Sequence, residues 1–134
     1  FGCVYQPRRV WHFPKSGVAV KAVSLRNQEG ASGAALEAEL LHRVADAAGL
    51  HANVVTLHGS FLVGEHARLA LDLATAGDLD QHMWRRRGLL PRSTALDLSG
   101  QLAAGLAHLH RADVAHRDLK LANALLFGGG GDAG

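Results

Sequence analysis

The sequence predicts an α+β fold, with two segments suited to strands and two longer segments suited to helices. Segments suited to strands lie at 18–23 and 67–73, and both are rich in aliphatic residues. Strong helix formers with one apolar face fill 34–48, and leucines recur at helical spacing over 93–110. Strand and helix segments in one chain, with a hairpin signal at 64–65 that favours antiparallel pairing, fit the α+β class.

Length and composition fit one small domain without a strong charge bias. The chain has 134 residues, of which 48% are hydrophobic and 19% charged, enough for one modest core. The net charge of +2 is too small to indicate nucleic-acid binding, and the basic run at 85–87 has no interleaved aromatic residues that would stack on bases. The single cysteine, Cys3, cannot form an internal disulfide, which fits a reducing, cytoplasmic-facing compartment. No apolar run approaches the ~18 residues that a membrane helix needs.

A lysine beside a small residue marks the strand predicted at 18–23. Side chains alternate between the faces of a strand, so Ala19 and Lys21 share one face, and Val18 and Val20 share the other. On such a face an alanine leaves room for a nucleobase and a lysine reaches phosphates. The alternative is that Lys21 is an ordinary exposed lysine.

The helix predicted at 34–48 supplies a carboxylate to that lysine. Glu37 lies three and four residues before two leucines of the apolar face and therefore points to the same side. A carboxylate turned toward a core needs a cation, and Lys21 is the available one. Glu39 is a rival, but it lies off the apolar face and can pair with Arg43. The apolar face consists of Leu36, Leu40, Leu41, Val44 and Ala48.

Turn signals divide the middle of the chain. Apolar residues at 54–57 supply core, and the Gly-Glu pair at 64–65 predicts a hairpin before the strand at 67–73. Asp78 is placed to cap a short helix that follows.

The long helix predicted at 93–110 begins after Pro91, which is acceptable near a first turn. Gly100 and Gly105 would each weaken an isolated helix by ~1 kcal/mol relative to alanine. Close packing against neighbours is the expected reason for both glycines. A short strand is expected at 125–126.

The stretch at 116–123 reads His-Arg-Asp-Leu-Lys-Leu-Ala-Asn. Phosphoryl transfer needs a carboxylate beside the attacking hydroxyl and an oxygen ligand that holds a metal at the phosphates. Asp118 and Asn123 fit these roles, and Lys120 is placed to offset the negative charge that develops on the phosphate. The pattern closely resembles the catalytic loop of eukaryotic protein kinases.

Other segments resemble the same family, in the same order along the chain. Residues 1–5 look like the end of a glycine-rich nucleotide loop, and Val-Ala-Val-Lys at 18–21 looks like the family's third strand. The resemblance implies a partial two-lobed protein-kinase-like fold. Its expected parts are an N-terminal lobe and hinge at 1–74, the start of a helical C-terminal lobe at 75–127 and a flexible glycine-rich tail at 128–134.

The function that the resemblance implies is transfer of the γ-phosphate of ATP, with Mg²⁺, to a protein Ser or Thr hydroxyl. Asp118 would orient the hydroxyl and accept its proton, Lys120 would stabilise the phosphoryl group, and Asn123 would hold Mg²⁺. Lys21, paired with Glu37, would hold the α- and β-phosphates. The remaining nucleotide contacts implied are Gly2 at the phosphates, Val4, Ala19 and Leu125 around adenine, Asp72 and Ala74 in the hinge, and Asp78 at the ribose.

The sequence also departs from the family pattern. It contains no Asp-Phe-Gly and no Ala-Pro-Glu motif, so metal chelation and peptide docking would be incomplete. Because the chain is also about half the expected length of such a domain and opens on Phe1, we expect an inactive, marginally folded fragment with exposed apolar surface. The spacing of the tryptophan and of Val-Ala-Val-Lys after the glycine loop resembles that of the tyrosine-kinase-like serine/threonine group.

Two other functions stay open. A pseudokinase would use the same fold as a binding or scaffolding module. A small-molecule phosphotransferase of the aminoglycoside or choline type shares the Asp-x-x-x-x-Asn spacing, although Arg117 and Lys120 favour a protein kinase. The nine histidines show no zinc-site spacing, and His116 is expected to anchor the catalytic loop in the core.

Overall fold

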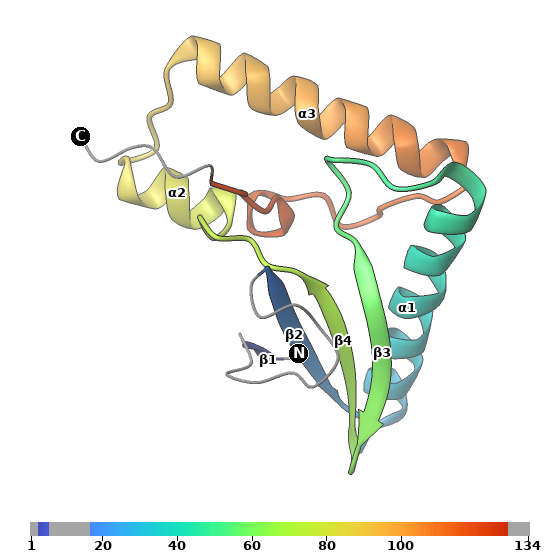
Figure 1. Cartoon of the computed structure of the whole chain (residues 1–134). Coiled ribbons are helices and arrows are strands. Elements are labelled where there is room, and N and C mark those ends of the chain that lie inside the picture. Colours follow the sequence, from blue (N-terminus) through green and yellow to red (C-terminus); the bar gives the residue numbers. More distant parts are fainter. Residues whose placement is uncertain (1–2, 6–16, 129–134) are drawn as a thin grey trace.

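The computed structural model describes residues 3–5 and 17–128 and combines one antiparallel sheet with three helices (Figure 1). The sheet has the strand order β1-β2-β4-β3. Its strands are β1 (Cys3–Tyr5), β2 (Val18–Ser24), β3 (Leu57–Val63) and β4 (His66–Asp72). The helices are α1 (Gln28–Ala48), α2 (Leu79–Arg85) and α3 (Arg92–Arg111), followed by a 3-10 turn, η1 (Leu121–Asn123). The predicted α+β class is confirmed.

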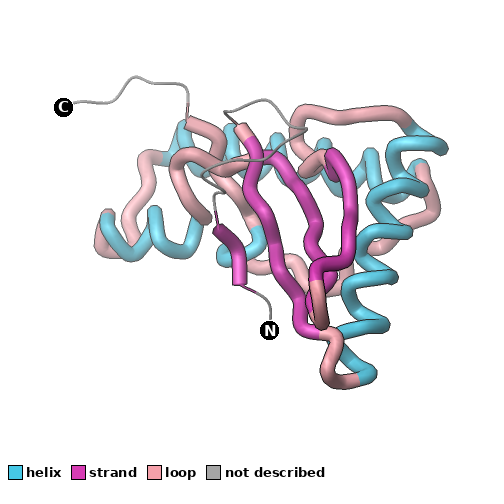
Figure 2. The backbone as a smooth tube through the Cα atoms, turned by 60° about the horizontal axis from the view of Figure 1, so that its bottom comes forward, coloured by secondary structure: helices cyan, strands magenta, loops and turns pink. Residues whose placement is uncertain are grey.

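The central strands β2 and β4 form the best-buried part of the sheet. They pair in register from Val18 with Asp72 to Ser24 with His66. A hairpin at Gly64, whose φ is 55°, joins β3 to β4 as expected. Helix α1 packs against β2, β3 and β4, and Figure 2 shows it beside the long strands. Five buried side chains line the two central strands: Val18, Ala19, Val20, Leu69 and Ala70.

Helix α1 begins at Gln28, six residues before the predicted start, because its capping signals lie upstream of the apolar pattern. The side chain of Asn27 accepts a hydrogen bond from the Gly30 N–H at 2.9 Å. A Cβ added at Gly30 would lie 2.2 Å from the Ser24 carbonyl oxygen, so only glycine fits this close approach to β2. The apolar face is also narrower than predicted, since Leu36 is 54% exposed.

The C-terminal ends of α1 and α3 meet, and the small core between them joins the helices (Figure 1). Val44 of α1 packs there with Ala112 and Val114, which follow α3. Helix α3 spans Arg92–Arg111, close to the predicted bounds. The predicted close packing holds at Gly105, where an added Cβ would lie 2.6 Å from the Asn53 carbonyl oxygen. It is wrong at Gly100, where nothing lies within 4 Å.

The strand predicted at 125–126 is also wrong, since only an isolated antiparallel bridge joins Leu125 to Asp78. The segment after η1 pairs with the loop that enters α2 and not with the sheet. The Leu79 N–H donates to the Ala124 carbonyl at 2.8 Å, and the Leu126 N–H donates to the Gly77 carbonyl at 2.8 Å. Within residues 3–5 and 17–128, no helix is long and apolar enough to cross a membrane.

Candidate active site

Lys21 and Glu37 form an ion pair between the sheet and α1. Lys21 lies on β2 between Val4 of β1 and Leu69 of β4. Its Nζ atom donates to both carboxylate oxygens of Glu37, at 2.9 and 2.6 Å, and both side chains are about one-third exposed, at 30% and 34%. The rival Glu39 is exposed. The pair therefore fixes the position of the lysine ammonium and ties α1 to the sheet.

Asp118, Lys120 and Asn123 form a second cluster in the loop around η1. Lys120 Nζ donates to Asp118 Oδ2 at 2.8 Å, and Asn123 Nδ2 donates to the same oxygen at 2.9 Å. Asn123 Nδ2 also donates to the Asp118 backbone carbonyl at 2.8 Å. Lys120 and Asn123 therefore both donate to the same carboxylate oxygen, Asp118 Oδ2. Among the residues that the structure describes, no hydrogen bond engages the other oxygen, Asp118 Oδ1.

The backbone of this loop is bent sharply just before Asp118. Arg117 has a φ of 61°, in the left-handed region that non-glycine residues rarely adopt. The Asp118 N–H donates to the His116 carbonyl at 2.8 Å and approaches His116 Nδ1 at 3.3 Å. Strained backbone of this kind clusters at functional sites. The expected anchoring of His116 in the core is wrong, because its side chain is exposed and bonds within its own turn.

The electrostatics of the cluster favour an ionised carboxylate. The hydrogen bond from Lys120, followed by the one from Asn123, holds the pKa of Asp118 below its ordinary value of 3.8. Asp118 is therefore charged near neutral pH, and it can accept a hydrogen bond there but is a weak base.

The metal-binding capacity of the cluster rests on Asn123. Its amide nitrogen must face Asp118, because both groups that it contacts there are acceptors. The amide oxygen is then available to a cation. The described ranges contain no group of three or more His, Cys, Asp or Glu side chains that could hold a metal ion. Mg²⁺ at phosphate groups commonly uses few protein ligands, so one amide oxygen fits a supporting role.

The segment that leaves β4 is the predicted hinge, and hydrogen bonds hold it at its start. The Asp72 N–H donates to the Thr56 carbonyl at 3.2 Å, and the Leu73 N–H donates to the Gly17 carbonyl at 2.8 Å. Ala19, predicted to contact adenine, lies on β2 and is buried. Asp78 is the N-cap of α2, where its Oδ1 accepts from the Gln81 N–H at 2.8 Å, as its sequence position predicts.

Three further residues were predicted to contact the nucleotide, namely Gly2, Val4 and Leu125. Gly2 lies outside the described residues, and Val4 is placed only by the pairing of its strand with Lys21. Leu125 is 43% exposed beside Asp78. The structure thus assembles two clusters, one around Lys21 and one around Asp118.

Sequence reasoning missed a contact of Asp72 with His58. His58 Nε2 lies 2.7 Å from Asp72 Oδ1, and Asp72 Oδ2 accepts from the Thr56 N–H at 2.8 Å. Burial alone would raise the pKa of Asp72, but the bonds from Thr56 and His58 outweigh it and hold that pKa below 3.8. The one signal in the sequence was a histidine at the start of the segment that forms β3.

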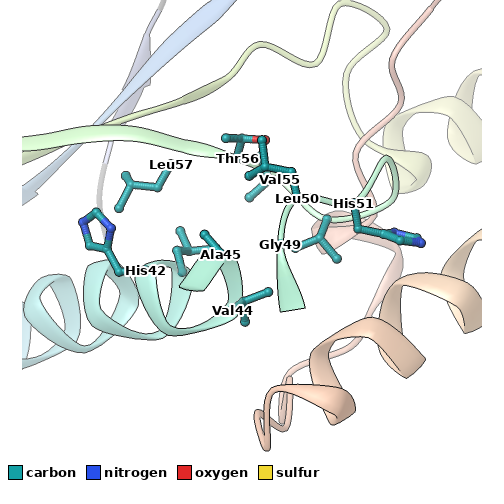
Figure 3. Close-up of a pocket in the computed structure, with 11 residues that line it drawn as sticks. His42, Val44, Ala45, Gly49, Leu50, His51, Val55, Thr56 and Leu57 are labelled. Carbon is teal, nitrogen blue, oxygen red and sulfur yellow. The ribbon is translucent and has the colours of Figure 1, made fainter. Parts of the chain in front are cut away.

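A pocket elsewhere on the molecule does not belong to this site. Figure 3 shows it between the C-terminal half of α1 and the segment before β3. Its wall includes His42, Ala45 and Leu57. None of the residues predicted to contact nucleotide or the transferred phosphate lines it.

Comparisons with known proteins point to one family. A family model described as "Protein kinase domain" matches residues 1–130. The chain is 33% identical over 138 residues to a probable serine/threonine-protein kinase, PBL18, of Arabidopsis thaliana, a match that covers 94% of this chain and 33% of that protein. It is 30% identical over 127 residues to the serine/threonine-protein kinase dst2 of Dictyostelium discoideum, with coverages of 94% and 10%.

A third relative comes from a virus. The chain is 37% identical over 106 residues to the serine/threonine-protein kinase US3 homolog of bovine herpesvirus 1.2 (strain ST), a match that covers 75% of this chain and 21% of that protein. The chain spans about a third or less of the length of these curated relatives.

Proposed function

The chain belongs to the protein kinase family, and from that premise we propose that it carries the nucleotide-binding and catalytic-loop part of an ATP-dependent serine/threonine kinase. The observation that carries the proposal is the cluster in which Lys120 and Asn123 both hold one oxygen of Asp118 and leave the other available. The Lys21–Glu37 pair supports it, because it presents a fixed cation to a phosphate chain.

In this proposal the nucleotide lies between the two clusters. Lys21 Nζ binds the α- and β-phosphates while Glu37 holds it in place. Ala19, Val4 and Leu125 enclose the adenine. The remaining contacts come from Gly2 at the phosphates, from the backbone of Asp72 and Ala74 at the purine edge, and from Asp78 at the ribose.

Asn123 would hold Mg²⁺ through its amide oxygen, together with phosphate oxygens and water. When bound, the ion neutralises negative charge on the phosphates. Asn123 has a second role, because the hydrogen bond from its amide nitrogen fixes the orientation of Asp118.

Asp118 acts on the hydroxyl that attacks. Its available oxygen, Oδ1, accepts a hydrogen bond from a Ser or Thr hydroxyl. This bond orients the hydroxyl oxygen of the substrate toward the γ-phosphorus. The new bond joins the hydroxyl oxygen to phosphorus, and the bond from phosphorus to the bridging oxygen breaks, so ADP leaves with that electron pair. The hydroxyl proton passes to Asp118. Because the lowered pKa makes Asp118 a weak base, orientation is its main contribution.

Lys120 compensates charge during the transfer. Its ammonium carries three donors, so it can keep its bond to Asp118 Oδ2 and donate to a γ-phosphate oxygen as well. Lysine at this position and the names of the relatives support a serine/threonine acceptor.

The chain itself is proposed to bind nucleotide without completing turnover. The sequence has no Asp-Phe-Gly motif to supply the main carboxylate ligand of Mg²⁺. Several large apolar side chains are also exposed, among them Trp84 at 83% and Leu89 at 75%. The whole protein's transfer activity, its protein substrate and its reducing compartment are part of the same proposal.

The test is a calorimetric titration of the chain with ATP and Mg²⁺. We expect wild-type binding, and affinity at least ~10-fold weaker for Lys21→Met, because the phosphates lose their cation. Arg26→Met is the matched control, since Arg26 is an exposed basic residue that pairs with Glu65 beside the β3–β4 hairpin. No binding by the wild type, or equal binding by Lys21→Met, would overturn the proposal.

A further inference from the structure

A β-bulge places His58 outside the regular ladder of the sheet. Leu57 of β3 pairs with Leu71, but the next paired residue of β3 is Gly59, which faces Ala70. Two steps on β3 thus correspond to one step on β4, and His58 is the extra residue. Bulges of this kind redirect a side chain and are frequent next to active sites.

The redirected side chain meets Asp72, the last residue of β4. His58 Nε2 lies 2.7 Å from Asp72 Oδ1, with side-chain exposures of 34% and 30%. The other carboxylate oxygen accepts from the Thr56 N–H at 2.8 Å. The Asp72 backbone N–H donates to the Thr56 carbonyl at 3.2 Å. Asp72 is therefore held at three points by the segment that opens β3.

Asp72 is also the first residue of the hinge. The next residue, Leu73, donates its N–H to the Gly17 carbonyl at 2.8 Å, at the start of β2. The backbone direction of 72–74 is thus set on one side by β2 and on the other by Thr56 and His58. A backbone that hydrogen-bonds to a purine edge binds the purine more tightly when it already has the bound geometry, because less conformational freedom is lost on binding.

We propose that His58 and Asp72 are positioning residues for adenine recognition: the bulge at His58 and its bond to the Asp72 carboxylate hold the hinge backbone in the conformation that binds the purine. The inference rests on the proposed nucleotide-binding function and adds to it a pair that acts through the backbone. Neither side chain touches the nucleotide in this scheme.

The pair could instead stabilise only the sheet, and a comparison of ligands separates the two roles. Adenosine contains the purine and no phosphate, whereas inorganic tripolyphosphate contains phosphates and no purine. A positioning role predicts weaker binding of adenosine and ATP with unchanged binding of tripolyphosphate. A general loss of structure weakens the binding of all three ligands.

The experiment is a calorimetric titration of the full chain and its variants with these ligands. His58→Ala should weaken ATP and adenosine binding about 5-fold to 10-fold, and tripolyphosphate binding less than about 2-fold. His58→Gln should restore part of the affinity, because its amide N–H can donate to Asp72. Glu65→Gln is the control, since it removes the exposed 2.6 Å pair with Arg26 and leaves the hinge intact.

Several outcomes would overturn the inference. Equal adenosine affinity for the wild type and His58→Ala would remove the positioning role and leave the proposed function standing. An equal loss for all three ligands would assign the pair to the stability of the sheet. If His58→Ala fails to fold, Asp72→Ala decides, because an adenosine affinity equal to that of the wild type after loss of the Asp72 carboxylate would exclude a role for the hydrogen bond. Absence of ATP binding by the wild type would overturn the proposed function and the inference together.

Discussion

Gly105 of α3 packs directly on the Asn53 carbonyl, so closely that an added Cβ would lie 2.6 Å from that oxygen. This contact brings α3 against the segment between α1 and β3. Through this contact the C-terminal part of the molecule, which includes the loop that carries Asp118, packs against the segment that leads into β3. Its packing therefore bears on the geometry of the candidate site.

The two glycines of α3 should respond in opposite ways to substitution by alanine. Gly105→Ala forces Asn53 to move, and we expect the free energy of unfolding to fall by about 1–3 kcal/mol. Gly100→Ala meets open space and gains helix propensity, so it should raise that free energy by up to about 1 kcal/mol. Chemical denaturation of both variants checks this. Similar effects of the same sign at both sites would contradict the packing described.

A second prediction concerns His108, which is buried on α3 three residues after Gly105. Its Nε2 bonds to the Gly49 carbonyl at 2.9 Å, its Nδ1 accepts from Arg111 at 2.9 Å, and its ring stacks on His51 with centroids 4.7 Å apart. His108→Leu removes both hydrogen bonds and leaves the Gly49 carbonyl without this partner. We expect a loss of about 1–3 kcal/mol in the free energy of unfolding.

The matched control for His108 is two residues further along the same helix. His110 is exposed, so His110→Leu should change the free energy of unfolding by less than about 0.5 kcal/mol. Equal stability of the two leucine variants in a denaturation series would show that the buried bonds contribute nothing.

A third prediction is the pH dependence that Asp72 gives to stability. Its folded pKa lies below 3.8 because the hydrogen bonds from Thr56 and His58 outweigh the effect of burial. A lowered carboxylate pKa stabilises the fold above its unfolded value, and this contribution is lost as pH falls through the folded pKa. The stability difference between the wild type and Asp72→Asn should be constant above about pH 5 and shrink below about pH 4.

The measurement for Asp72 is a pair of unfolding series at several pH values, one for each protein. A difference that stays constant down to about pH 2, or that grows with acidity, would show that Asp72 is not stabilised in its ionised form.

Helical periodicity selected Glu37 over Glu39, and the resemblance to protein kinases implied its pairing with Lys21, which the structure shows. This periodicity placed Glu37 on the apolar side of α1, and a carboxylate on that side requires a cation. Strand periodicity placed Lys21 on a face beside Ala19. The local sequence also predicted the hairpin at Gly64 and the cap at Asp78, because turns and caps depend on a few adjacent residues.

The remaining features depend on contacts between distant segments. Helical periodicity did not locate the start of α1, because the cap at Asn27 and the close fit of Gly30 against Ser24 lie upstream of the apolar pattern. The His58–Asp72 contact requires a bulge, and a bulge interrupts the period of two on which strand prediction rests. The isolated bridge at Leu125 reflects the loop that it pairs with and not its own propensity for a strand.

The most direct test of the central claim labels the lysines with an acyl-phosphate derivative of ATP, which transfers its acyl group to amines beside bound phosphates. The lysines of the chain are Lys15, Lys21 and Lys120, and the proposed site contains the last two. Mass spectrometry should find Lys21 and Lys120 acylated, and excess ATP should suppress that labelling while leaving any labelling of Lys15 unchanged. Labelling of Lys21 that ATP does not suppress, or no labelling at either site residue, would contradict the account.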